Sequence, residues 1–159
     1  MKVVYALEDI DKVSPSIFLA GPTHRESGHR GWRKDAIEHL ESFDGEVYYP
    51  EARTGIWHGD YPKQIEWEWE GLESASVILF WVPRDMDKLP ALTTNVEFGL
   101  WLHSGKSILG YPSDATSMNY LDYIYRKVCE REPYGNLEAT CQGANKHAEA
   151  LGAFGGRFR

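Results

Sequence analysis

One carboxylate, Glu97, stands among apolar and small residues in the stretch LTTNVEFGLW at residues 92–101. It lies between two apolar runs, at residues 77–82 and 107–111, that are typical of buried strands. In an open α/β sheet, ligands bind at the carboxyl ends of strands, where loops and helix starts meet. A carboxylate at such a helix start either takes part in covalent chemistry or offsets the helix dipole. The local sequence leaves both interpretations open.

A second acidic motif, QIEWEWE at residues 64–70, has helical character. On a helix Glu66 and Glu70 share a face, while Glu68 projects about 200° away from Glu66. One of these acids can face a pocket as a proton donor, or all three can form a solvated face with the tryptophans turned inward. The motif does not decide which of the three would be the acid.

A third motif is the basic loop THRESGHRGWRK at residues 23–34, which follows a predicted strand and enters a helix. Backbone N–H groups, Arg25, Arg30 and the helix dipole could together hold a phosphate or another anion. The alternative is a flexible basic loop balanced by nearby acids. An anion site here would favour a 5′-phosphorylated substrate.

These three motifs fall between elements that alternate strictly along the chain, which implies a parallel sheet covered on both faces. We expect strands at residues 3–7, 16–21, 46–49, 76–82 and 107–111, and helices at residues 32–42, 63–74, 94–104, 120–129 and 137–151. The first strand is expected to be a short edge strand. The fold class is therefore α/β, a flavodoxin-like or Rossmann-like sandwich, and residues 1–159 form one domain.

The composition excludes several classes of protein. The 159 residues are 42% hydrophobic and 26% charged, with a net charge of −7, which argues against a nucleic-acid polymer as partner. No apolar run approaches the roughly 20 residues of a membrane span, and the acidic N-terminus is unlike a signal peptide, so we expect a soluble cytoplasmic protein. Phosphate-loop, dinucleotide, nucleophile-elbow and zinc motifs are absent, and we expect no metal or cofactor.

The six tryptophans are many for a chain of this length. Trp and Tyr surplus is typical of ligand pockets and oligomer interfaces as well as of cores. Trp57 and Trp67 are candidates to stack on a planar ligand.

Four segments in order, SIFLAGP, WRKDAIEHL, SVILFWVPRD and NVEFGLWLHSGKSILGYP, resemble the nucleoside deoxyribosyltransferase-like family over roughly residues 16–125. The related nucleotide N-hydrolases share the same plan. The resemblance implies cleavage or transfer at the N-glycosidic bond of a nucleoside or nucleotide. It also implies a homo-oligomer whose sites are completed across an interface.

Carried over by position, the resemblance makes Glu97 the nucleophile that attacks the anomeric carbon of the sugar. Glu68 falls where the family has an acid that handles the proton on the departing base. The loop Ala20, Gly21 and Pro22 matches the segment that lies against the base and sugar.

This chain departs from the family pattern at one position. Many transferases have an Asp six residues before the nucleophile, where this chain has Ala91. Substrate contacts near this point are expected from Thr93, Thr94 and Asn95, and Asn119 aligns with an Asn that a neighbouring subunit lends in some transferases. The resemblance therefore indicates the reaction more firmly than the substrate.

The chemistry follows from the residue types. An oxocarbenium-like transition state is stabilised by a nearby carboxylate, and attack by Glu97 gives a covalent glycosyl-enzyme with retention of configuration. A free nucleobase as acceptor makes a transferase, and water makes an N-hydrolase. The alternative is a nucleotide-binding or sensing module of the same fold without turnover.

Overall fold

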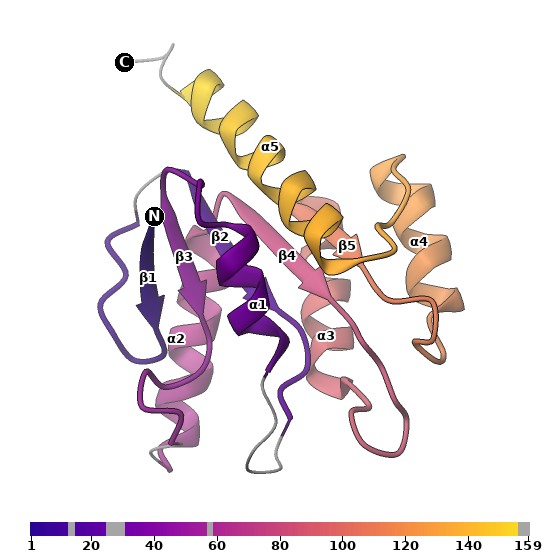
Figure 1. Ribbon diagram of the computed structural model, residues 1–159, viewed down its shortest axis with the longest axis horizontal. Helices are drawn as coiled ribbons and strands as arrows, with labels where there is room; N and C mark the ends of the chain where they lie inside the picture. The colour runs from indigo at the N-terminus through magenta and orange to yellow at the C-terminus, as the bar shows by residue number, and fades with distance from the viewer. Residues whose placement is uncertain (13–14, 25–30, 57–58, 156–159) are drawn as a thin grey trace.

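The computed structural model describes residues 1–12, 15–24, 31–56 and 59–155 as a parallel five-stranded sheet between two helical layers (Figure 1). The strands run in the order β1-β3-β2-β4-β5 and are β1 (Lys2–Tyr5), β2 (Ser16–Ala20), β3 (Glu46–Tyr49), β4 (Val77–Trp81) and β5 (Ser107–Gly110). All four neighbouring pairs are parallel. The predicted α/β sandwich is confirmed, and β1 lies at the edge of the sheet.

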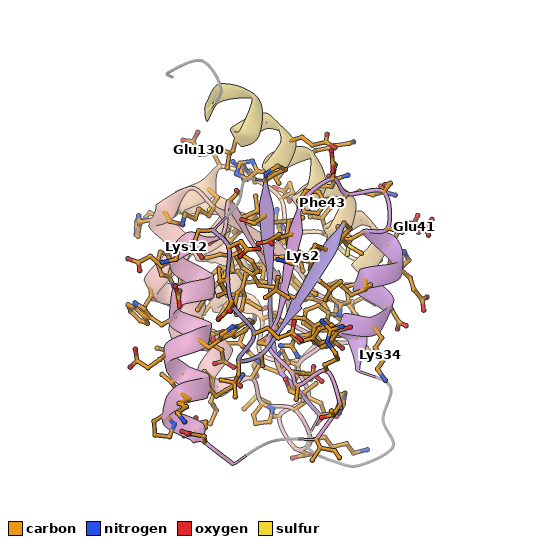
Figure 2. All side chains as sticks on the ribbon, turned by 90° about the vertical axis from the view of Figure 1, so that its left-hand side faces the viewer. Lys2, Lys12, Lys34, Glu41, Phe43 and Glu130 are labelled. Atoms are coloured by element: carbon orange, nitrogen blue, oxygen red, sulfur yellow. The ribbon has the colours of Figure 1, made fainter. Side chains whose placement is uncertain are left out.

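Helices cover both faces of this sheet. They are α1 (Trp32–His39), α2 (Tyr61–Ser74), α3 (Leu92–Trp101), α4 (Asn119–Cys129) and α5 (Leu137–Gly155). One core cluster joins α1 and α5 to the sheet, and a second joins α2, α3 and α4 to its other face. Figure 2, seen from the β1 edge, shows α1 and α2 on opposite sides of the strands.

The centre of the sheet follows directly from apolar sequence. All five residues of β2 and all five of β4 are buried, as expected for central strands covered on both faces. The chain leaves β2 for β3 on one side and later returns to β4 on the other side of β2. Such a reversal of direction opens a crevice at the carboxyl ends of the two strands.

Several element boundaries differ from the predicted ones by a few residues, and two of these differences have a local reason in the backbone. The first strand ends at Tyr5 rather than residue 7, because Leu7 adopts a left-handed φ of 68° that an extended strand cannot contain. Helix α3 begins at Leu92 rather than residue 94, directly after Ala91, which has a left-handed φ of 57°. This earlier start matters for Glu97, which consequently lies in the second turn.

In the part of the chain that the structure describes, no helix has the length and apolar character needed to cross a membrane.

Candidate active site

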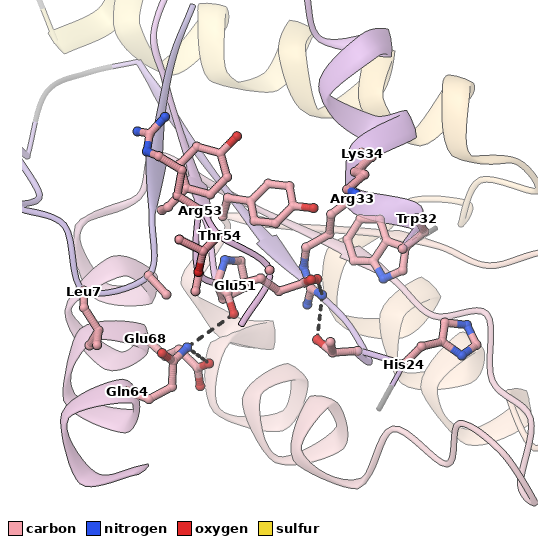
Figure 3. A pocket seen from close by; sticks show the side chains of 18 of the residues that line it. Leu7, His24, Trp32, Arg33, Lys34, Glu51, Arg53, Thr54, Gln64 and Glu68 are labelled. Atoms are coloured by element: carbon pink, nitrogen blue, oxygen red, sulfur yellow. Dashed lines mark hydrogen bonds and ion pairs between the residues drawn. The ribbon is translucent and has the colours of Figure 1, made fainter. Parts of the chain in front are cut away.

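A cavity of about 1210 Å³ lies at the carboxyl edge of the sheet, where the loops after β1, β2 and β3 meet α1 and α2 (Figure 3). Its walls include Tyr5, Pro22, Arg33, Glu51 and Glu68. This is the edge at which parallel α/β sheets bind their ligands. The volume is somewhat above the range of about 300–1,000 Å³ typical of small-molecule pockets.

Arg33 is one of the residues that line this cavity; it comes from the first turn of α1 and is only 2% exposed. Its Nε donates to the Leu19 carbonyl at 3.0 Å, and its Nη2 donates to the Gly21 carbonyl at 2.5 Å. Its Nη1 donates to Thr23 Oγ1 and to Glu51 Oε1, both at 2.7 Å. One guanidinium therefore ties the end of β2 and the loop after it to the loop after β3.

Glu68 is the acid of α2 that reaches the cavity. Gln64 Nε2 donates to Glu68 Oε1 at 2.8 Å and to the Pro50 carbonyl at 3.3 Å, which fixes the carboxylate relative to the loop after β3 (Figure 3). Glu66 is exposed, and Glu70 is exposed and pairs with Lys12 at 2.8 Å. Of the three acids in the motif, only Glu68 lines the cavity.

Glu97 is partly buried and has a raised pKa; it does not line the cavity, but it lies close enough to Glu68 and Arg33 for their charges to act on it. The pKa of Glu97 is raised from 4.5 to about 7, because burial and, to a smaller extent, the charge of Glu68 raise it while the charge of Arg33 opposes the rise. The first turn of α3 contains no acid. The interpretation of Glu97 as a helix-start acid stabilised by the dipole is therefore wrong, because the carboxylate lies one turn further along and its pKa is raised rather than lowered.

The two glutamates interact electrostatically, because the charge of Glu68 raises the pKa of Glu97. Burial also raises the pKa of Glu68, while the hydrogen bond from Gln64 and the charge of Arg33 lower it. A charged Glu68 disfavours ionisation of Glu97, so Glu97 keeps its proton to higher pH than an isolated glutamate would. Such a pair can both give and accept a proton near neutral pH.

The loop after β2 passes close to β4 and needs a glycine there. Gly21 has φ of +150°, and a Cβ on it would lie 2.2 Å from the Trp81 carbonyl oxygen. Pro22 lines the cavity, and its carbonyl accepts a hydrogen bond of 3.0 Å from Trp32 Nε1. Ala20 is buried in the sheet directly before this loop.

Several other predicted substrate contacts lie away from the cavity walls. Trp67 is buried in the core, where its Nε1 donates to the Glu8 carbonyl at 2.7 Å and its ring is 6.3 Å from that of Phe18. At the start of α3, Thr94 is buried and Thr93 is exposed.

Asn95 lines a second, smaller cavity rather than the main one. Asn119 is exposed at the start of α4 and likewise does not line the main cavity. A contact from Asn119 to a neighbouring subunit's substrate stays a prediction. Arg25, Arg30 and Trp57 lie outside the described residues, so their roles also stay predictions.

The sequence motifs did not single out Arg33 or Glu51. The spacing of Arg33 does indicate burial. It precedes Ala36 and Leu40 by three and seven residues, so it shares the apolar face of α1. A charged residue on an apolar face needs a buried partner. Glu51, two residues after the end of β3, was the acid placed to provide it.

A parallel α/β sandwich with two interacting, partly desolvated carboxylates at its carboxyl edge is typical of enzymes that act on a small ligand bound there. Comparison with protein families agrees with this class. Residues 14–115 match the family described as nucleoside 2-deoxyribosyltransferase like. The chain belongs to this family, and the matched region runs from just before β2 to just after β5. No curated protein matches the chain.

Proposed function

We propose that the protein cleaves the N-glycosidic bond of a nucleoside or nucleotide and passes the sugar to water or to a free nucleobase. Membership in the family supports this class of reaction. The observation that carries the proposal is that the charges of Glu68 and of the buried Arg33 both act on the partly buried Glu97. Glycosyl transfer with retention requires two carboxyl groups, one to attack and one to move a proton.

In the first step, a carboxylate oxygen of Glu97 attacks the anomeric carbon of the sugar. The bond from this carbon to the base nitrogen breaks, and its electron pair leaves with the base. Glu68 gives its proton to the departing base, so the base leaves neutral and Glu68 becomes a carboxylate. The product is a glycosyl ester of Glu97.

In the second step, water or a free base attacks the same carbon from the opposite side. Glu68 accepts the proton that the acceptor loses, and the ester bond breaks to restore the Glu97 carboxylate. Two inversions give overall retention of configuration. The acceptor alone distinguishes a hydrolase from a transferase.

This mechanism needs Glu97 ionised and Glu68 protonated when the substrate is bound. The raised pKa of about 7 instead leaves a proton on Glu97 in a large part of the free protein at neutral pH. A proton shift within the pair on substrate binding gives the required state. We propose that the developing positive charge on the sugar favours this shift, because it stabilises a carboxylate at Glu97.

Arg33 favours the ionised form of Glu97. Its charge lowers the pKa of both glutamates, while its hydrogen bonds hold the loop after β2. We assign it a positioning role, because its N–H groups are directed at protein acceptors rather than at the cavity.

The function is tested by chromatography of a panel of nucleosides and 5′-nucleotides incubated with the protein, with and without a free base. We expect base release from at least one substrate, and loss of release in Glu97→Gln and Glu68→Gln. Glu66→Gln, an exposed neighbour on α2, is the matched control and should keep full activity. Binding of a nucleotide without turnover in any reaction would favour the sensing module instead.

A further inference from the structure

A second cavity of about 370 Å³ lies between the segment after β4, the start of α3 and α4. It shares no lining residue with the main cavity. Its walls combine apolar side chains from α3 and α4 with three polar residues, Arg84, Asn95 and Ser117. Asn95 and Glu97 project about 200° apart on α3, so this cavity and the glutamate pair occupy different sides of the helix.

Arg84 is a buried cation in this cavity and is 4% exposed. Its Nη1 donates to the Ser117 carbonyl at 2.8 Å, its Nη2 donates to Asn95 Oδ1, and its Nε is buried without a partner. Within residues 1–12, 15–24, 31–56 and 59–155, no carboxylate forms an ion pair with it. Arg33, by contrast, is equally buried and pairs with Glu51.

A buried guanidinium with only neutral acceptors is unusual, because removing a charge from water costs several kcal/mol unless an opposite charge compensates. Burial accordingly lowers the pKa of Arg84. The first turn of α3 adds to the positive potential, since Leu92, the first residue of the helix, lines the cavity and no side chain caps the helix. Free N–H groups at a helix start attract anions.

We propose that this cavity binds a compact oxyanion, a phosphate or carboxylate group, with Arg84 as its counter-ion. The fork of guanidinium N–H groups suits the paired oxygens of such a group. The oxyanion is either free in solution or carried by a larger ligand such as a nucleotide. The proposal does not depend on cleavage of the N-glycosidic bond.

Isothermal titration calorimetry of the full chain with inorganic phosphate, in a low-chloride buffer of constant ionic strength, tests the proposal. We expect saturable binding that weakens at least tenfold in Arg84→Met and less in Arg84→Lys, which keeps the charge but loses the fork. Arg126→Met is the matched control and should leave the affinity unchanged, because Arg126 is exposed on α4 and pairs with Asp122. Glu97→Gln should also bind phosphate normally, which separates this proposal from the proposed function.

Parallel titrations with a nucleoside and with its 5′-monophosphate distinguish the two sources of the anion. Dependence on Arg84 for phosphate alone indicates a free ion, and dependence only for the monophosphate indicates a ligand-borne group. The proposal is overturned if wild-type protein binds neither, or if Arg84→Met and Arg84→Lys bind both as tightly as wild type. Should Arg84→Met not fold, the wild-type and Arg84→Lys titrations still decide the matter.

Discussion

Replacing Glu97 by Gln should stabilise the protein at alkaline pH while it abolishes turnover. In the folded protein the pKa of Glu97 is about 7, against a usual value of 4.5. Because the folded-state pKa is the higher one, the stability that protonated Glu97 contributes is fully present below pH 4.5. This contribution is lost as the pH rises through about 7. The difference between the two pKa values corresponds to a loss of about 3 kcal/mol in the free energy of unfolding at pH values above the folded-state pKa.

A neutral amide avoids this cost. We therefore expect Glu97→Gln to raise the free energy of unfolding by up to about 3 kcal/mol at pH 8, and to change it far less at pH 5. Urea denaturation of both proteins at the two pH values measures the difference, with Glu66→Gln as a control for the loss of one charge from the exposed surface. An equal effect at pH 5 and pH 8, or a loss of stability at pH 8, would refute the burial and pairing assigned to Glu97.

Three further changes have expected outcomes. Glu68→Gln should reduce the rate of base release by about 10²–10⁴, measured by steady-state kinetics, and the loss should shrink for substrates whose base leaves without protonation. Arg33→Met should move the acidic limb of the pH–rate profile to higher pH, because removing this charge raises the pKa of Glu97; an unmoved limb would count against the assigned role. Gly21→Ala should lower the thermal unfolding midpoint, since its Cβ would meet backbone at 2.2 Å, whereas Gly99→Ala, with open space around its Cβ, should leave it unchanged or raise it.

The sheet could be predicted from sequence because its central strands are apolar throughout. Residues 77–82 read as a buried strand, and the structure has β4 there with every side chain buried. The position of Glu97 within its helix could not be predicted as well. It depended on the left-handed backbone of Ala91, which starts α3 two residues early, and alanine carries no sequence signal for that conformation.

The residues of the site could be predicted from the sequence only in part, for a related reason. Glu68 could not be separated from Glu66 and Glu70 by spacing alone, because the choice depends on where α2 sits against the loop after β3. Arg33 looked like part of a basic loop, yet it is buried by contacts with β2 and Glu51 that are far apart in sequence. A tryptophan such as Trp67 suits both a stacking platform and a protein core, and only the packed structure shows its contact with Phe18.

The central claim is that Glu97 forms a bond to the sugar. Incubation with a 2′-fluorinated arabinonucleoside, which slows the second step more than the first, should trap this ester. Mass spectrometry of the intact protein, followed by mapping of its peptides, should find one glycosyl group on the peptide that contains Glu97. An adduct on Glu68 would reverse the two roles, and the absence of any adduct on a protein that turns over the parent nucleoside would contradict the covalent mechanism.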